Sequence, residues 1–297
     1  MLMTVYDLVH PKHFAEALNS VAQQTLGPAE LVVVADGPLT PALDEVLAHF
    51  DPPFPVRVLR LETNVGAGLA SAAGLVGIEA EWLARFDADD ISAPHRLQRQ
   101  LEVLSDAERS GEPVDVLGSD MREFSDEASG AVVGIRALPR GDAQIRRYAR
   151  LNSPINNPTV MMRTSAVRAA GGYRHQPFME DYDLYARMIS TNCRFANLPE
   201  TLVDFRVSPA MYERRRGLAF LRTEIGMQRR LRSYGLIGVP AMVRNLVLRM
   251  GYRLLPVNLL RRAHATLFHR MPNTQPGESS PDQSPTPTRH RPTRNPC

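Results

Sequence analysis

Apolar residues in the first two thirds of the chain form two kinds of run. Short continuous runs, such as residues 31–35, are typical of strands buried on both faces of a sheet, whereas spacing by three or four positions is typical of amphipathic helices. The expected strands cover residues 2–6, 31–35, 56–61, 82–86, 114–119, 131–137 and 195–206, and another is entered from the polar turn at 156–159. Helical patterns alternate with them, which predicts an α/β fold with a mostly parallel central sheet flanked by helices.

The strand at 82–86 ends abruptly in the acids Asp87, Asp89 and Asp90. Their mutual repulsion is most simply relieved by a divalent cation held through oxygen atoms, and Mg²⁺ or Mn²⁺ is the natural candidate. Such an ion usually shares its coordination with substrate phosphates, so the stretch suggests a nucleoside diphosphate ligand. Ser92 is the expected N-cap of the helix that follows.

Plainer interpretations remain open. The acids after residue 86 would also suit a solvated loop that only caps the next helix, because short acidic motifs often match by chance. Residues 66–71 partly match a dinucleotide-binding fingerprint, but Ser71 stands where Gly or Ala is needed and the first strand–helix turn lies elsewhere. Small residues there are better explained by close packing of a helix against the sheet or a bound nucleotide.

Further acids stand at ends of predicted elements. Asp36 follows the buried strand at 31–35, and the carboxyl ends of strands are where open α/β sheets bind ligands. Glu180 and Asp181 fall in the first turn of a predicted helix. Carboxylates there gain about 0.3–1 kcal/mol from the helix dipole, so a plain helix cap is one explanation of that pair.

Charge is unevenly distributed along the chain. The 297 residues carry a net charge of +3, yet residues 211–270 hold 13 Arg against two Glu. The helices predicted there are amphipathic, which favours an anionic membrane surface or a phosphate-bearing acceptor over nucleic acid; packing on the α/β domain or on a homodimer partner is the alternative. We expect an α/β domain at 1–210, a basic helical extension at 211–271 and a disordered Pro- and Ser-rich tail at 272–297.

The cysteine content and hydropathy bear on location. Cys193 and Cys297 suggest neither a disulfide framework nor a zinc site, which fits a reducing cytoplasm. No signal peptide is visible, and no uninterrupted apolar run reaches the roughly 18 residues of a membrane-spanning helix. We therefore expect a cytoplasmic protein, peripheral at the inner face of the cell membrane.

The motifs of residues 1–210 together resemble the family 2 glycosyltransferases of the GT-A fold, and among them the bacterial enzymes that build surface polysaccharides. The matching stretches are Ser20-Val21, Gln24-Thr25, Glu30 to Pro38 ending in Asp36-Gly37-Pro38, Asn64-Val65-Gly66, Asp87-Ala88-Asp89-Asp90 with Ile91 and Pro94, Asn157-Pro158-Thr159 and Glu180-Asp181. Their shared order and spacing are far more specific than any single motif.

The resemblance implies a role for each matched residue. Contacts with the nucleotide sugar would come from Thr4, Tyr6, Asp36, Asn64, Gly66, Arg85, Asp87, Asp89 and Arg206. Among these, Asp36 would hydrogen-bond the base, and Asp87 and Asp89 would hold Mg²⁺ or Mn²⁺ near the diphosphate. Across the site, Asp181 would be the catalytic base, with Glu180 beside it orienting the acceptor. For Arg206, a solvated start of the basic helices is an equally simple explanation.

The implied activity is a hexosyltransferase-like transfer from a nucleotide-diphosphate sugar to a glycan or lipid-linked acceptor. Inversion needs a carboxylate opposite the leaving group to take the proton of the incoming hydroxyl, and a cation to stabilise the leaving diphosphate. A sugar nucleotidyltransferase is one rival, but residues 6–13 offer only Lys12 and no glycine for its usual phosphate loop. A non-catalytic nucleotide-sugar-binding or scaffold protein is another, although it would need neither Asp89 nor Asp181.

Overall fold

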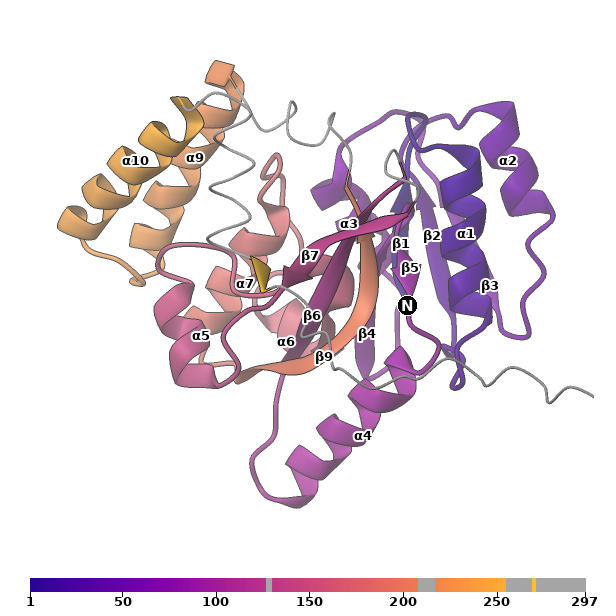
Figure 1. Cartoon of the computed structure of the whole chain (residues 1–297), viewed down its shortest axis with the longest axis horizontal. Helices are drawn as coiled ribbons and strands as arrows, with labels where there is room; N and C mark the ends of the chain where they lie inside the picture. The colour runs from indigo at the N-terminus through magenta and orange to yellow at the C-terminus, as the bar shows by residue number, and fades with distance from the viewer. Residues whose placement is uncertain (127–129, 208–216, 255–268, 271–297) are drawn as a thin grey trace, which may run out of the picture.

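A computed structural model of the chain describes residues 1–126, 130–207, 217–254 and 269–270, and one curled sheet runs through it (Figure 1). Its strands are β1 (Leu2–Val5), β2 (Leu31–Ala35), β3 (Val56–Arg60), β4 (Trp82–Asp87), β5 (Ile91–Ser92), β6 (Val116–Ser125), β7 (Ala131–Arg136), β8 (Met161–Arg163), β9 (Phe195–Arg206) and β10 (His269–Arg270). The strand order is β10-β7-β6-β8-β4-β1-β2-β3, and β9 pairs with both β5 and β6.

The helices lie mostly between these strands in sequence. They are α1 (Pro11–Ala22), α2 (Pro41–Ala48), α3 (Ala67–Leu75), α4 (Arg96–Arg109), α5 (Asp142–Tyr148), the short 3₁₀ helix η2 (Asn157–Thr159), α6 (Thr164–Ala169), α7 (Glu180–Ser190), α9 (Gly217–Ser233) and α10 (Val239–Leu254). The alternation of strand and helix predicted for the first half of the chain is confirmed.

The sheet has a parallel half and a mixed half. Strands β3, β2, β1 and β4 are all parallel, and every residue of β2 is buried, as its continuous apolar run predicts. Beyond β4, the pairs β4–β8, β6–β8 and β6–β7 are antiparallel, while β6 and β9 are parallel. The carboxyl ends of β1, β2 and β4 therefore meet at one edge of the sheet.

Two hydrophobic cores cover the two faces of the sheet. On one face, side chains of α1, α2 and α4 pack against alternate residues of β1, β2 and β4, with Phe14 and Phe86 at the centre. On the other face, α3, α5, α6 and α7 pack against the intervening residues, such as Leu2 and Leu83. Because strand side chains alternate between faces, this arrangement decides which residues of β4 reach each layer.

The expected start of α4 is wrong. Ser92 is not a helix N-cap but part of β5, whose Ile91 and Ser92 pair with Asp204 and Val203 of β9, and α4 begins at Arg96. The Ser92 backbone amide donates to Ser20 Oγ at 3.0 Å. Bonds to partners distant in sequence thus replace the local cap. Helices α5 and α6 have no counterpart among the sequence predictions.

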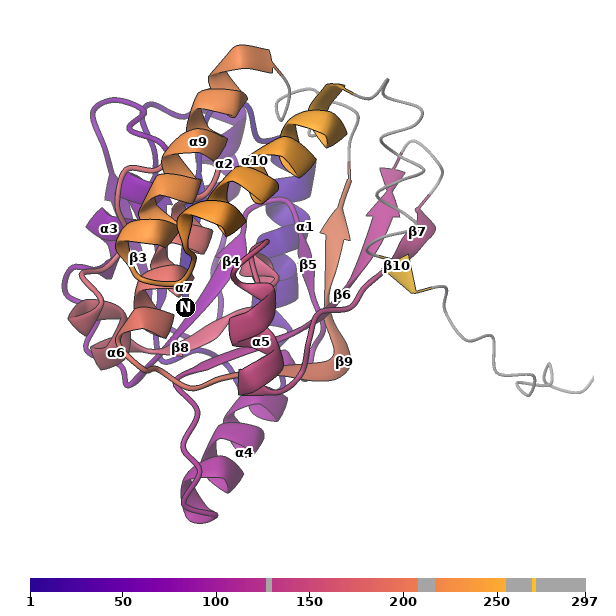
Figure 2. The same ribbon diagram turned by 90° about the vertical axis from the view of Figure 1, so that its left-hand side faces the viewer.

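Helices α9 and α10 form an antiparallel pair packed against α7, as Figure 2 shows most clearly. The contact is an apolar cluster of Met179, Tyr182, Ala186, Phe220, Met227, Leu231 and Ile237. It is reinforced by the buried Asp183 of α7, whose Oδ1 accepts hydrogen bonds from Tyr234 Oη at 2.8 Å and Arg230 Nη1 at 3.3 Å. One face of the described helical extension is therefore fixed to the α/β domain.

Two sequence predictions fall outside the described residues. The expected disordered tail at 272–297 is one, and the parts of the basic extension at 211–216, 255–268 and 271 are the other. Within the described ranges, every helix is too short or too polar to span a bilayer.

Candidate functional site

The acidic turn follows β4 at the edge where the parallel strands end. Asp87 is half-buried, and its Oδ1 lies 3.1 Å from Arg85 Nη2. Arg85 itself is only 3% exposed, and its guanidinium donates to Thr4 Oγ1 at 2.8 Å and to the Leu2 carbonyl at 3.3 Å. The structure thus brings together Thr4, Arg85 and Asp87, three of the residues predicted to contact the nucleotide sugar.

Asp90 is the most deeply buried acid of the turn. Its Oδ1 accepts the backbone N–H of Arg206 at 2.9 Å, while its Oδ2 has no hydrogen-bond partner in the described part of the chain. Burial raises the pKa of Asp90 well above its ordinary value, and Asp89 and Asp87 add to the rise. Three crowded carboxylates and an unpartnered carboxylate oxygen are what a divalent cation would neutralise.

The described residues alone do not form a complete metal cage. No group of three or more His, Cys, Asp or Glu side chains in the described ranges has an arrangement that could hold a metal ion. Asp87 contacts Arg85 and Asp90 accepts the Arg206 N–H, and Asp89 stands between them in sequence as a further candidate ligand. This set fits a Mg²⁺ or Mn²⁺ ion whose coordination is completed by substrate phosphates and water.

Arg206 joins the end of β9 to the acidic turn. Its Nε donates to the Asp89 carbonyl at 2.9 Å, and its guanidinium pairs with Glu16 at 2.6 Å and with Asp126. The residue predicted to lie over the diphosphate is thus beside the acidic turn. Its guanidinium is already held by two carboxylates, so a role toward phosphate stays a prediction.

Asp36 organises the loop after β3. Its Oδ1 accepts the Val65 N–H at 2.7 Å and its Oδ2 accepts the Gly66 N–H at 3.0 Å, while Asn64 Oδ1 also accepts the Gly66 N–H at 3.2 Å. Gly37 has a φ of +89° and approaches the loop so closely that a Cβ would lie 2.8 Å from Asn64 N. The structure therefore brings Asp36, Asn64 and Gly66 together. The Asp36 N–H donates to Val5 O, and Tyr6 is the next residue after Val5, so its backbone lies near Asp36.

The second acidic pair begins α7 on the face that carries α3. Burial raises the pKa of Glu180 to about 7, and the Asp181 carboxylate adds to the rise. Arg85 opposes this rise and Asp87 increases it, so the pair on α7 and the end of β4 are electrostatic neighbours. Acids that are about 90 residues apart in sequence therefore lie within electrostatic range of one another, and their joint use in one site stays a prediction.

Sequence reasoning missed two further residues of this site. Tyr173 is buried, its hydroxyl has no hydrogen-bond partner within the described ranges, and burial raises its pKa under the added influence of Asp181 and Glu180. Arg96 is fully buried beneath β4, where its Nη2 donates to the Arg85 carbonyl at 2.8 Å. The sequence signal for Arg96 was its position: it is a charged residue in the first turn of α4, on the side of the helix that faces the core.

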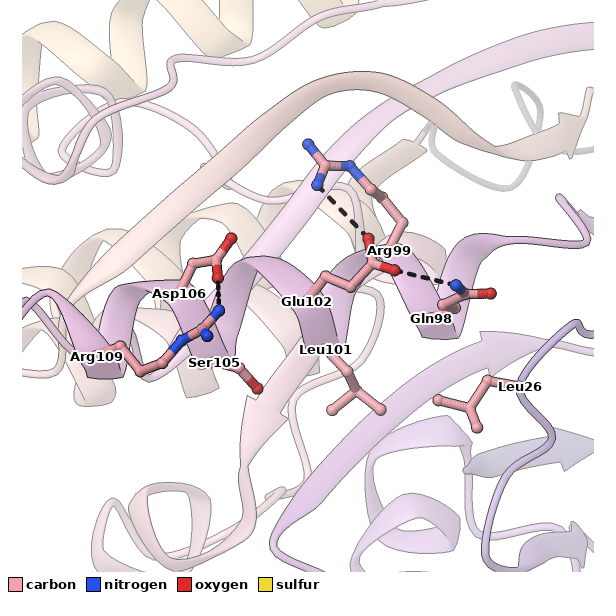
Figure 3. A pocket seen from close by; sticks show the side chains of 8 residues that line it. All are labelled: Leu26, Gln98, Arg99, Leu101, Glu102, Ser105, Asp106 and Arg109. Carbon is pink, nitrogen blue, oxygen red and sulfur yellow. Dashed lines mark hydrogen bonds and ion pairs between the residues drawn. The ribbon is translucent and has the colours of Figure 1, made fainter.

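A separate depression of about 580 Å³ lies along α4, away from these acids (Figure 3). Its walls include Leu26 and Leu101, and its charged residues are already paired, Arg109 with Asp106 and Arg99 with Glu200 of β9. It offers no uncommitted catalytic chemistry, so the acid-lined edge of the sheet is the candidate active site.

Comparison with known proteins identifies the class of enzyme to which this fold and its acidic edge belong. The family model described as "Glycosyl transferase family 2" matches residues 2–168, which is more than half of the chain. The chain belongs to this family, is a glycosyltransferase and has the GT-A fold.

Several relatives match over most of their length. The amylovoran biosynthesis glycosyltransferase AmsE of Erwinia amylovora is 31% identical over 88% of this chain and 96% of its own. The Escherichia coli UDP-Gal:alpha-D-GlcNAc-diphosphoundecaprenol beta-1,3-galactosyltransferase is 28% identical over 87% of this chain and 92% of its own. Among solved structures, S. aureus TarS 1–349 in complex with UDP-GlcNAc has a TM-score of 0.60 at 17% identity and covers 90% of this chain and 73% of its own.

Proposed function

We propose that the protein transfers one hexose from a nucleotide-diphosphate sugar to a hydroxyl of a glycan or lipid-linked acceptor, with inversion at the anomeric carbon, in cell-surface polysaccharide synthesis. The observation that supports the proposal is that Arg85 and Asp87 at the end of β4 lie within electrostatic range of Glu180 at the start of α7, as acids of one active site would. The names of the AmsE and galactosyltransferase relatives support the substrate class.

In this reaction the two acidic groups do different work. Asp181 accepts the proton of the acceptor hydroxyl as its oxygen bonds to the anomeric carbon, while the bond from that carbon to the diphosphate oxygen breaks. Glu180, next to Asp181, orients the acceptor. Asp36, Asn64 and the Thr4–Arg85 pair hold the base and ribose at the ends of β1, β2 and β4.

We propose Mg²⁺ or Mn²⁺ as the cofactor, held by Asp89 with Asp87 nearby. When bound, the cation stabilises the negative charge that develops on the leaving diphosphate. A solved structure of a mannosyltransferase with the same fold, from Pyrobaculum calidifontis, is in complex with GDP-Man and Mn²⁺; it is 14% identical, with a TM-score of 0.56, and covers 90% of this chain and 79% of its own. Its ligands support the choice of cation class.

A nucleotide-release assay tests the reaction. The protein is incubated with Mn²⁺ and a panel of UDP-, GDP- and dTDP-sugars, and nucleoside diphosphate is measured. Asp89→Ala should abolish metal-dependent donor binding, whereas Asp181→Asn should retain donor binding and stop transfer. Asp106→Asn, an exposed acid of α4, is the matched control and should leave both unchanged. Transfer by Asp181→Asn at the wild-type rate would show that the base is a different group.

We also propose that the helical extension rests on an anionic bilayer. The outward side of α10 exposes Val239, Val243, Val247, Leu248 and Met250, each between 42% and 64% exposed. Exposed arginines, among them Arg229, Arg232 and Arg244, stand on the same helix pair. An apolar stripe accompanied by cationic side chains matches the interface of a membrane with acidic headgroups.

Vesicle sedimentation tests the membrane contact. The protein should sediment with phosphatidylglycerol vesicles and much less with phosphatidylcholine vesicles. Replacing Val247 and Leu248 by Glu should abolish sedimentation, while Val76→Glu, a similarly exposed change at the residue that follows α3, should not. If the stripe instead covers a second copy of the chain, the double variant will convert a dimer to a monomer in light scattering, with no vesicle binding by either form.

A further inference from the structure

A strained aromatic residue precedes the catalytic pair. Gln176 O accepts the Met179 N–H at 3.1 Å, which closes a turn whose central residues are Pro177 and Phe178. Phe178 has a φ of +62°, in the left-handed region. Proline followed by a positive φ is the pattern of a type II turn, in which the third position is normally glycine. A bulky residue there is disfavoured, so its side chain has a reason to be present.

The ring of Phe178 is exposed although it is large and apolar. The residue is 54% exposed, and its ring lies 5.5 Å from the ring of Phe220, centroid to centroid, at an angle of 39°. Phe220 is itself buried among Met179 and Tyr182 in the contact between α7 and α9. Phe178 is thus supported from the side of α9 and remains accessible elsewhere.

Its position relates this exposed ring to the reaction. Phe178 is two residues before Glu180 and three before Asp181, on the segment that leads into α7. A hexose ring presents C–H groups on one face and hydroxyls at its edge. Such a ring can bury its C–H face on an aromatic side chain while an edge hydroxyl reaches a nearby carboxylate.

We propose that Phe178 is the platform on which the acceptor saccharide packs, so that its hydroxyl is directed toward Asp181. The inference rests on the proposed function and adds the acceptor subsite to it. The chemistry it selects for is a pyranose acceptor with an unsubstituted C–H face. In the left-handed turn the ring rests on Phe220 at the edge of the α7–α9 contact and keeps more than half of its surface exposed.

The test separates acceptor binding from donor chemistry. Phe178→Gly suits the positive φ and should leave the thermal midpoint unchanged or raised, and Phe178→Leu keeps apolar bulk without a flat face. With alkyl glycosides of glucose, galactose and N-acetylglucosamine as acceptors, both variants should lose at least about tenfold in kcat/KM for acceptor. Both should keep wild-type donor hydrolysis in the absence of acceptor. Phe178→Tyr should retain transfer, and the exposed Val76→Ala is the control.

Binding gives a second readout that does not depend on turnover. Phe178→Trp adds a fluorophore to a chain whose only other tryptophan is Trp82, so the difference spectrum reports on residue 178. With UDP and Mn²⁺ present, millimolar alkyl glycosides should shift this difference emission. Absence of a shift, or equal losses of hydrolysis and transfer in Phe178→Leu, would overturn the platform. Absence of donor hydrolysis in the wild type with every nucleotide sugar would instead reject the proposed function.

Discussion

Gly68 offers a direct test of how closely α3 approaches Glu180, a member of the proposed catalytic pair. A Cβ added to this glycine would lie 2.5 Å from the carbonyl oxygen of Arg174 and 3.0 Å from Glu180 Cβ. The first of these neighbours is backbone and cannot rotate away. In Gly68→Ala, the segment that leads into α7 must therefore move by several tenths of an ångström or more.

Two opposing effects decide the sign of the change in stability. Alanine is favoured over glycine in a helix by about 1 kcal/mol, whereas overpacking typically costs about 1–3 kcal/mol. Because the contact is with backbone, we expect Gly68→Ala to lower the free energy of unfolding by about 1–2 kcal/mol. The displaced Glu180 should also reduce the rate of transfer more than tenfold, since a shift of about 1 Å in a catalytic group has effects of that size.

The same substitution elsewhere provides the control. Gly226 lies within α9, and the nearest atom to an added Cβ is Gln176 Nε2 at 3.9 Å. Gly226→Ala should therefore raise the free energy of unfolding by about 0.5–1 kcal/mol. Urea denaturation followed by circular dichroism measures both variants. If Gly68→Ala proves as stable and as active as Gly226→Ala, the close approach of α3 to Glu180 does not exist.

Three more predictions address stability. Burial raises the pKa of Glu180 from its ordinary value of 4.5 to about 7, so the folded protein binds this proton more tightly than the unfolded chain does. The free energy of unfolding should therefore fall by up to about 3 kcal/mol as the pH rises from 4.5 to 7. Glu180→Gln should remove that part of the pH dependence. Asp183→Ala leaves the buried Arg187 without its partner, so urea unfolding should show a loss of about 3–5 kcal/mol, and limited proteolysis should release α9 sooner than in the wild type. Asp36→Ala removes two hydrogen bonds from backbone amides of the 64–66 loop and should lower the free energy of unfolding by about 2 kcal/mol, measured by thermal unfolding. An unchanged thermal midpoint would show that these two hydrogen bonds do not stabilise the loop.

The local pattern of apolar residues was enough to predict the parallel half of the sheet. The run at 31–35 becomes β2 with the same bounds, and the acids after β2 and β4 reach the same edge because parallel strands end there. Ser92 shows the limit of local pattern. It has the side chain of a helix cap, but in the fold it pairs with Val203, more than 100 residues away, and no short window of sequence contains that partner.

In the site, too, the sequence indicates where a residue lies but not which partners its side chain contacts. Resemblance to a family indicates that Arg206 stands near the diphosphate, and the structure places it at the acidic turn. It does not indicate that Glu16 and Asp126 hold the guanidinium, because these carboxylates come from α1 and from the end of β6. The Tyr173 hydroxyl, which finds no hydrogen-bond partner among the described residues, is equally invisible in sequence, since only packing determines whether a tyrosine finds one.

Asp183 has a consequence for substrate length. It lies within the first turn of the helix that begins with Glu180 and Asp181, and it ties that helix to α9 through Arg230 and Tyr234. If the α9–α10 pair sits on a lipid surface, this rigid link sets the height of the proton acceptor above the headgroups. The protein would then select acceptors by length: it would extend lipid-linked chains whose terminal sugar lies at that height and would not extend shorter or longer ones.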